Sequence, residues 1–160
     1  MKKQFRKVAV GGTFDELHKG HRELLSKAFE VGEYVLIGLT SDEFVSNMHK
    51  PHKTAPYAER FADLTAFLEQ SGFKNRFEIS KLKNSYGLTL NRDGLDALVV
   101  SQETVKTGEE INRKRAKVGL PQLSIVEINL VPAENKKPIS TTRIRANEID
   151  RNGHLLKHKA

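Results

Sequence analysis

Short apolar runs alternate with longer amphipathic stretches along this chain of 160 residues. Apolar or β-branched runs of about four to eight residues are typical of buried strands, and apolar residues three or four positions apart are typical of helices. The pattern predicts five strands, at Lys7–Val10, Tyr34–Leu39, Phe77–Leu82, Leu95–Val100 and Leu123–Val131. It predicts helices at Lys19–Val31, from Pro56 to a stop at Gly72, and at Glu109–Val118, which Gly119 closes.

Strands that alternate with helices of this length are typical of parallel βαβ units. We therefore expect an α/β fold with a doubly wound, Rossmann-like, five-stranded parallel sheet. Residues 1–160 form a single domain in this interpretation, with residues 152–160 as a tail that frays. Ligands of such sheets bind beyond the carboxyl ends of the strands, where the strand order reverses. The ends of the predicted strands are thus where functional residues are expected.

A glycine pair follows the first predicted strand. Gly11 and Gly12 allow unusual backbone torsion angles and the close approach of a ligand. The helix predicted from Lys19 points free N–H groups and the positive end of its dipole at this turn, which suits a phosphate. His18 and His21 share one face of an ideal helix, so both imidazoles could donate hydrogen bonds to one phosphoryl group.

Other interpretations of this stretch stay open on the residues alone. The glycine pair could be a simple connector between a strand and a helix. The two histidines could be exposed side chains that bind nothing. They could also bind a metal ion, but the Glu of an H-E-x-x-H helix is absent and the chain has no cysteine. We therefore predict no metal bound by the protein itself.

The amino-acid composition limits the number of domains, the cellular compartment and the kind of ligand that we expect. A chain of this length with 38% hydrophobic and 29% charged residues can bury one core. The absence of cysteine suits a reducing compartment, and no apolar run approaches the ~20 residues that span a bilayer, so we expect a cytoplasmic protein with no membrane contact. The formal net charge of +7 indicates affinity for anions, either nucleic acid or small phosphate compounds.

Two motifs carry a resemblance to a known group of proteins. The run G-G-T-F-D-E-L-H-K-G-H, from Gly11 to His21, resembles the first signature of the nucleotidyltransferase superfamily that is related to class I aminoacyl-tRNA synthetases. The run I-S-T-T-R-I-R, from Ile139 to Arg145, resembles the second signature of that superfamily. Both motifs occur in the expected order, which is more specific than either motif alone.

A third stretch resembles one branch of this superfamily. V-V-S-Q-E-T from Val99, then Asn112, Arg115 and Gly119-Leu120, is similar to the phosphopantetheine adenylyltransferases of the archaeal and eukaryotic type. The resemblance implies that ATP and 4′-phosphopantetheine give dephospho-coenzyme A and pyrophosphate, by direct in-line attack without a covalent intermediate. It also implies Mg²⁺ on the pyrophosphate part of ATP, and dephospho-coenzyme A or coenzyme A as ligands.

The resemblance implies roles for the residues of the first motif. His21 would hold the α-phosphate of ATP as its charge grows, and His18 would contact the nucleotide phosphates beside it. Thr13 and the backbone near Phe14 would contact the phosphate of phosphopantetheine. The Gly11–Gly12 turn and Phe14 are also predicted to border the nucleotide.

The resemblance implies further phosphate contacts from other parts of the chain. In the second motif, hydroxyl and N–H groups would meet the β and γ phosphates, with a cation beside them; these residues are Ser140, Thr141, Thr142 and Arg143. Arg115 would contact phosphate as well. Lys50 or Lys53 would bridge the attacking phosphate and the α-phosphate, with Lys50 slightly favoured, while Asp15 braces the turn. The implied catalytic set is His18, His21, Lys50 and Arg143.

Three alternatives remain beside this function. A cytidylyltransferase would share the first motif, but Asn135–Pro138 stands where such enzymes carry R-T-E-G. An adenylyltransferase for a flavin or nicotinamide nucleotide is the second. A nucleic-acid-binding module without catalysis is the third, and the intact motifs disfavour it, so we expect no nucleic acid partner. The oligomeric state is left open, with a monomer slightly favoured.

Overall fold

Five parallel strands form one sheet in the order β3-β2-β1-β4-β5. The computed structural model describes residues 3–48, 53–86, 89, 94–102 and 104–129. The strands are β1 (Phe5–Gly12), β2 (Gly32–Thr40), β3 (Phe77–Leu82), β4 (Ala97–Ser101) and β5 (Ser124–Ile128). The helices are α1 (Lys19–Val31), α2 (Asp42–Asn47), α3 (Tyr57–Gln70) and α5 (Val105–Lys117). This arrangement confirms the predicted α/β fold with a five-stranded parallel sheet.

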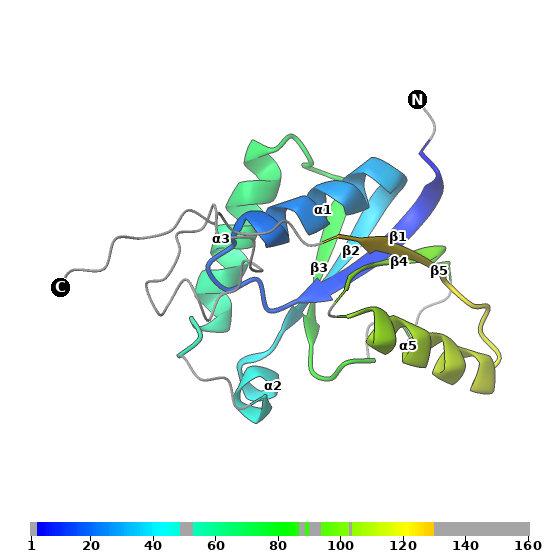
Figure 1. Cartoon of the computed structure of the whole chain (residues 1–160). Coiled ribbons are helices and arrows are strands. Elements are labelled where there is room, and N and C mark those ends of the chain that lie inside the picture. Colours follow the sequence, from blue (N-terminus) through cyan, green and yellow to red (C-terminus); the bar gives the residue numbers. More distant parts are fainter. Residues whose placement is uncertain (1–2, 49–52, 87–88, 90–93, 103, 130–160) are drawn as a thin grey trace.

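Helices cover both faces of the sheet (Figure 1). Alternate residues of a strand point to opposite faces, and β1 shows this directly. On one face, β1 and β4 pack against α1 and α3 through Val8, Val10, Leu25, Phe29, Leu64, Leu68 and Val99. On the other face, the core includes α5 and consists of Ala9, Leu36, Leu82, Leu95, Leu98, Val100, Ile111 and Leu123. The central strands are therefore apolar on both faces, as their near-continuous hydrophobic sequences predict.

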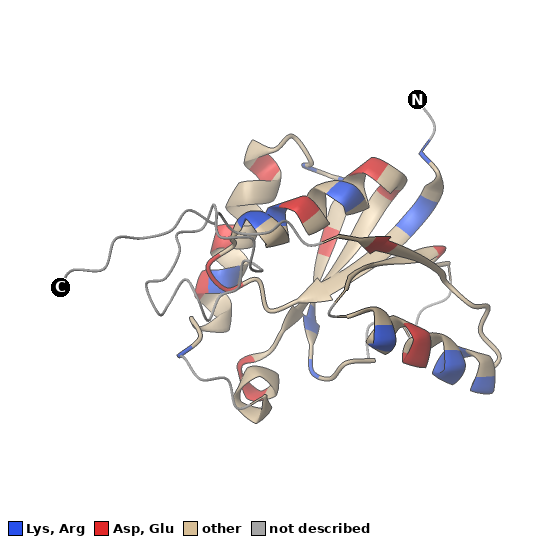
Figure 2. Cartoon of the chain, viewed as in Figure 1, with Lys and Arg blue, Asp and Glu red and all other residues tan. Residues whose placement is uncertain are grey.

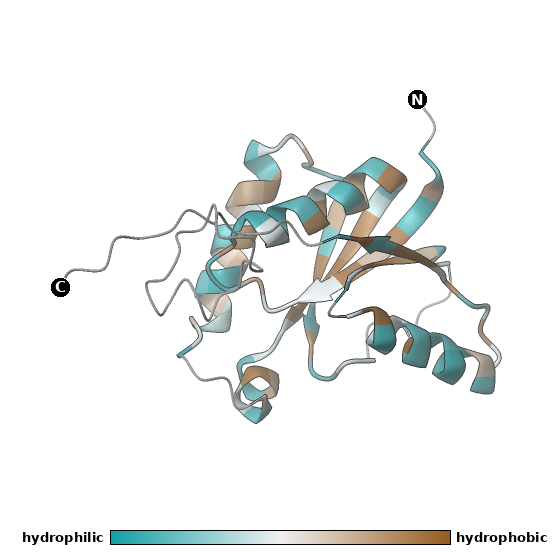
Figure 3. Ribbon diagram, viewed as in Figure 1, coloured by the Kyte–Doolittle hydropathy of each residue, from teal (hydrophilic) through white to brown (hydrophobic). Residues whose placement is uncertain are grey.

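The distribution of polarity follows these two cores. The central strands are coloured as hydrophobic along most of their length, while the helices alternate between hydrophobic and hydrophilic residues (Figure 3). Charged residues gather on the helices and at the ends of strands (Figure 2). No helix in the described part of the chain is long and apolar enough to cross a membrane.

The predicted strands are all present, with small differences at their ends. β1 begins earlier than predicted, at Phe5, because its first residues pair with the start of β2. Leu95 and Leu123 are buried but precede their strands. Residues 130 and 131 of the last predicted strand lie outside the described residues. Gly72 and Gly119 follow α3 and α5 with φ of 84° and 80°, which agrees with the predicted helix stops.

Two helical features were not predicted. α2 is a helix of six residues that begins directly after β2, and the Ser41 hydroxyl caps it by accepting a hydrogen bond from the N–H of Phe44. Six residues are too few to show a helical period in the sequence. α5 begins at Val105 rather than at Glu109, because Gly108 packs closely against β4 and β5 and continues the helix.

The strand order reverses beside β1. The chain runs from β1 outward to β2 and β3, and then crosses back to place β4 on the other side of β1. β1 and β4 therefore diverge into different connections at their carboxyl ends, and doubly wound sheets bind ligands in the crevice that this creates. The loop from β1 to α1, which carries the first motif, lies at this position (Figure 1).

Candidate active site

The loop between β1 and α1 is held in an unusual backbone conformation. Phe14, Glu16 and Leu17 have positive φ values of 50°, 65° and 33°. Non-glycine residues rarely adopt this region, and such strain gathers at functional sites. Phe14 and Asp15 are both buried, so the loop folds back onto the sheet instead of extending into solvent.

The glycine pair has a role different from the one that the sequence predicts. Neither glycine is among the residues with positive φ, and β1 continues through Gly12. A Cβ atom on Gly12 would lie 3.2 Å from the ring of Phe14. The missing side chain of Gly12 therefore makes room for the Phe14 ring, which turns back over the end of β1.

His18 and His21 form a reciprocal cap at the start of α1. The N–H of His21 donates to Nδ1 of His18 at 3.3 Å, and the N–H of His18 donates to Nδ1 of His21 at 3.2 Å. Their rings stack with centroids 3.6 Å apart. Each imidazole satisfies a backbone donor that the first turn of a helix leaves unpaired, as in a capping box. The structure thus brings these two predicted site residues together.

This cap determines which ring nitrogen carries a hydrogen. Because Nδ1 of each neutral imidazole accepts a hydrogen bond, its hydrogen must be on Nε2. Burial, with a smaller contribution from the positive charge of Arg22, lowers the pKa of His18 to about 4. His18 is therefore neutral at physiological pH, and its ring can act as a donor through Nε2–H.

Neighbouring residues fix the positions of the two rings. The Phe14 ring meets the His21 ring edge to face, with centroids 5.4 Å apart. A Cβ atom on Gly20 would come within 2.9 Å of Cε1 of His18, closer than real atoms approach. The motif therefore needs glycine at position 20, because any side chain there would push the His18 imidazole out of the cap.

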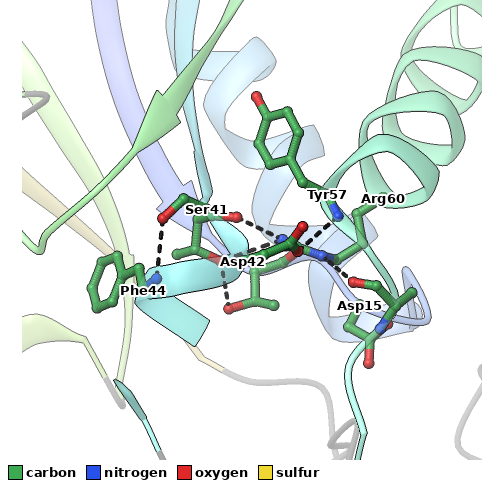
Figure 4. A network of polar contacts seen from close by, with 9 residues as sticks. Asp15, Ser41, Asp42, Phe44, Tyr57 and Arg60 are labelled. Carbon is green, nitrogen blue, oxygen red and sulfur yellow. Dashed lines mark hydrogen bonds and ion pairs between the residues drawn. The ribbon is translucent and has the colours of Figure 1, made fainter. Parts of the chain in front are cut away.

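Thr13 lies beside a polar network that the sequence did not reveal. Its hydroxyl accepts a hydrogen bond from the Thr40 hydroxyl at 3.0 Å, and its carbonyl accepts one from Arg60 at 3.1 Å. Arg60 is 1% exposed and also pairs with Asp42 (Figure 4). The only sequence signal was spacing, since Arg60 stands four residues before Leu64 and so occupies a position of the buried stripe of α3.

The segment that carries Lys53 is attached to the same loop. The N–H of Ala55 donates to the carboxylate of Asp15 at 3.3 Å, so the segment before α3 lies against the β1–α1 loop. This contact agrees with the predicted bracing role of Asp15. Lys53 itself is exposed. Lys50 and the whole second motif, with Ser140, Thr141, Thr142 and Arg143, lie outside the described residues.

The structure does not bring Arg115 into this group. Arg115 is ten positions into α5, about 15 Å along the helix from its start beside the end of β4. Its guanidinium donates to the carbonyls of Pro121 and Thr89, at 2.8 and 2.6 Å. Burial lowers its pKa. These contacts hold the chain segments around α5 together, and they favour a structural role over the predicted phosphate contact.

The donors at the ends of β1 and β2 suit phosphate oxygens. They comprise imidazole Nε2–H groups, threonine hydroxyls and the N-terminus of α1. Within the described ranges, no group of three or more His, Cys, Asp or Glu residues could hold a metal ion. The arrangement can therefore stabilise negative charge on a phosphoryl group next to the β1–α1 loop.

Comparison with known proteins shows the family. A model of the cytidylyltransferase-like family matches residues 9–147, a range that includes both sequence motifs. A phosphopantetheine adenylyltransferase of Thermococcus gammatolerans is 48% identical, with 98% of each chain covered. One of Pyrococcus abyssi is 46% identical, over 98% of this chain and 99% of the relative. The chain belongs to the phosphopantetheine adenylyltransferases. This confirms the branch that the sequence motifs indicated and makes the protein a nucleotidyltransferase.

A solved structure supports the same family-level fold. A protein of unknown function from Archaeoglobus fulgidus is 34% identical and superposes with a TM-score of 0.70. The match covers 84% of this chain and 99% of that protein. The single-sheet architecture described above is therefore shared across nearly the whole of that relative.

Proposed function

We propose that the protein transfers the adenylyl group of ATP to 4′-phosphopantetheine, which gives dephospho-coenzyme A and pyrophosphate. Membership of the phosphopantetheine adenylyltransferases supports this reaction over transfer to a flavin or nicotinamide nucleotide. A phosphate oxygen of phosphopantetheine attacks the α-phosphorus of ATP. The bond from that phosphorus to the bridging oxygen of the β-phosphate breaks, and its electron pair leaves with pyrophosphate.

The reciprocal His18–His21 cap is the observation that carries the mechanism. The nucleophile is already an anionic oxygen, so the reaction needs positioning and charge stabilisation more than a strong base. The cap holds both Nε2–H donors in fixed orientation beside the positive end of α1 before any ligand arrives. Donors that are already in place lower the barrier because they do not have to reorganise as charge develops.

The remaining roles follow the position of each residue. His21 donates to the α-phosphate, and His18 positions His21 and contacts the nucleotide beside it. Thr13 and Lys53 bind the phosphate of phosphopantetheine, since Thr13 is part of the β1–α1 loop and the segment that carries Lys53 lies against this loop. Lys50 joins them, and the second motif binds the β and γ phosphates through Ser140, Thr141, Thr142 and Arg143. We leave Arg115 out of this set because its described partners are carbonyls of the fold.

We also propose that Mg²⁺ accompanies ATP. The described donors are nitrogen and hydroxyl groups that suit phosphate oxygens, whereas Mg²⁺ prefers carboxylates, water and phosphate oxygens. The ion is therefore assigned to the polyphosphate, where it neutralises charge on the leaving group. The binding of coenzyme A to the same site, a monomeric state, a cytoplasmic location and the absence of a nucleic acid partner stay predictions.

Pyrophosphate release from purified protein tests the reaction. ATP and CTP are each combined with 4′-phosphopantetheine, glycerol 3-phosphate, phosphocholine, FMN and nicotinamide mononucleotide, with Mg²⁺ present. We expect release only from ATP with phosphopantetheine. Release from CTP or with another acceptor would overturn the substrate assignment, and no release from folded protein would favour the binding-module alternative.

A matched pair of variants tests the role of His21. Asparagine places its oxygen near the position of Nδ1, so His21→Asn keeps the acceptor of the cap and removes the Nε2–H donor. Glutamine places its amide near Nε2, so His21→Gln keeps a donor and removes the cap acceptor. We expect His21→Asn to lower kcat by roughly 10²- to 10³-fold with little loss of stability. His21→Gln should keep more activity and lose about 1 kcal/mol of stability. Equal kcat for the two variants would contradict the assigned donor.

A further inference from the structure

Arg60 carries a buried positive charge that the reaction as proposed does not use. It lies in the first turn of α3, and its guanidinium reaches between the ends of β1 and β2 (Figure 4). Burying a charge is costly unless it is paired and hydrogen bonded. The described ionic partner, Asp42, has a side chain that is 62% exposed, and the other partners of Arg60 are uncharged oxygens.

The contacts of Arg60 converge on the proposed acceptor side of the site. Nε donates to the carbonyl of Ala55 at 2.8 Å, and Nη2 donates to the carboxylate of Asp42 at 3.0 Å. Nη1 donates to the carbonyl of Thr13 at 3.1 Å and to the carbonyl of Thr40 at 2.9 Å. It also donates to the hydroxyl of Thr40 at 3.3 Å. One side chain thus links the end of β1, the end of β2, the start of α2 and the segment before α3.

These contacts set the direction of a hydrogen-bond chain. A guanidinium can only donate, so the Thr40 hydroxyl accepts from Arg60. The single hydrogen of Thr40 then goes to the hydroxyl oxygen of Thr13, at 3.0 Å. Because the Thr13 oxygen accepts this bond, its own hydrogen is left to point in another direction. The Thr13 hydroxyl is therefore prepared to donate.

We propose that Arg60 is a positioning residue that acts through Thr40 to present the Thr13 hydroxyl as a hydrogen-bond donor to the phosphate of the acceptor substrate. The inference rests on the proposed function and deepens it, because it assigns the residues that select and orient the acceptor rather than ATP. A positive charge at one end of a hydrogen-bond chain polarises the hydroxyls along it. The donor at the far end is then better suited to an anionic oxygen than an isolated hydroxyl would be.

The same guanidinium also positions the segment that carries Lys53. Arg60 donates to the carbonyl of Ala55, and the N–H of Ala55 donates to the carboxylate of Asp15 in the β1–α1 loop. Thr13 and the Lys53 segment are therefore fixed relative to each other by one buried cation. Loss of Arg60 should accordingly weaken the binding of phosphopantetheine more than the binding of ATP.

A substitution at Thr40 tests the hydrogen-bond chain without removing a buried charge. Thr40→Val keeps the shape of the side chain and removes the hydroxyl that links Arg60 to Thr13. We expect KM and Kd for phosphopantetheine to rise about tenfold, with KM and Kd for ATP unchanged. Thr40→Ser restores the hydroxyl and should return both values close to wild type. Unchanged phosphopantetheine affinity in Thr40→Val would overturn the proposal.

A double-mutant cycle with Thr13→Val distinguishes an effect through the hydrogen-bond chain from a general effect on the fold. If Thr40 acts through Thr13, Thr40→Val should have no further effect on phosphopantetheine affinity once the Thr13 hydroxyl is gone. Independent, multiplicative effects of the two substitutions would contradict the proposal. Arg60→Met, if it folds, should show the same selective loss.

Two controls keep the outcomes distinct. Thr65→Val removes a buried hydroxyl on the same helix that has no hydrogen-bond partner among the described residues, and it should leave both affinities unchanged. Wild-type protein that releases no pyrophosphate from ATP and phosphopantetheine would overturn the proposed function itself. Wild-type protein that is active but insensitive to Thr40→Val would overturn only the role of Arg60 and Thr40.

Discussion

At the scale of single residues, the cap made by His18 and His21 combines stability and chemistry. Histidine is a poor substitute for the usual Ser, Thr, Asn or Asp at a helix N-terminus if only the cap matters. It has a second nitrogen, however, and the cap uses only Nδ1 of each ring. The two residues therefore close the first turn of α1 through Nδ1, and each ring still carries a hydrogen on Nε2.

The pKa of His18 predicts a pH dependence of stability. Its pKa is about 4 in the folded chain and 6.5 when unperturbed, so between these values the unfolded chain binds a proton that the folded chain does not. The contribution of His18 to the free energy of unfolding is therefore fully present above pH 6.5. It is lost as the pH falls toward 4, by an amount on the order of 3 kcal/mol. Urea titrations of the wild type at a series of pH values measure it. His18→Asn keeps a cap acceptor and cannot titrate, so its stability should fall less over this range; parallel curves for the two proteins would contradict the assignment.

The substitution Gly20→Ala should lower the activity and change the stability of the fold little. In Gly20→Ala the new Cβ would meet the His18 ring at 2.9 Å, so the imidazole must move. A displacement of about 1 Å in a positioned group can cost roughly 10²-fold in rate. Loss of the His18 cap would cost about 1 kcal/mol. The preference of a helix for alanine over glycine, about 0.5–1 kcal/mol, largely offsets this cost, so the melting temperature should not fall strongly. Ser26→Ala, at an exposed position of α1, is the matched control and should leave kcat unchanged. Normal kcat in Gly20→Ala would show that the ring position does not matter.

At the scale of elements, the junction between α1 and β2 is unusually tight. α1 ends at Val31 and β2 begins at Gly32, with no loop between them. Gly32 pairs with Phe5 across the sheet, and its missing side chain leaves room for Val8 of β1. The close fit of these two strands fixes the position of β1 along β2, and therefore the position of the loop that carries the histidines.

Gly32→Ala should destabilise the fold. The added Cβ would lie 2.7 and 2.9 Å from the two methyl groups of Val8 and 3.2 Å from the carbonyl of Ala28. Overpacking of this kind costs about 1–3 kcal/mol. Urea unfolding of Gly32→Ala, Val8→Ala and the double variant measures the coupling. The double variant should lose less than the two single losses together, because Val8→Ala removes the clashing methyl groups. If the losses of the two single variants simply add, the destabilisation does not come from the clash with Val8 but from another contact, for example with the backbone carbonyl of Ala28.

At the scale of the whole molecule, topology gathers residues that are distant in sequence. The order β3-β2-β1-β4-β5 puts the ends of β1 and β2 side by side, and α3 returns across the same face. Thr13, Thr40 and Arg60 meet there although 27 and 47 residues separate Thr13 from the other two. Each has its role only in this sheet order, because the site is made by the ends of neighbouring strands.

The net charge of the molecule predicts a dependence of the reaction on salt. The formal charge of +7 and a pI near 9.6 should attract the anionic substrates over distances of about one Debye length. Raising KCl from about 0.05 to about 0.5 M should therefore lower kcat/KM for phosphopantetheine while kcat changes little. Initial rates over this series measure it, with sucrose at matched viscosity as the control. A kcat/KM independent of salt would show that the charge does not steer the substrate.

The sequence by itself determined the strands, the class of fold and the chemistry of the first motif. The central strands are apolar on both faces. The strand, turn and helix with two histidines can be recognised from the sequence because their residues are neighbours in the chain. Gly20, α2 and Arg60 depended on the tertiary structure. The need for glycine at position 20 appears only when the His18 ring is in place, and a helix of six residues has no period to detect. Arg60 occupies an apolar position of α3 because its partners come from the loop after β1, from β2 and from α2. Only the folded sheet brings these oxygen atoms to one guanidinium.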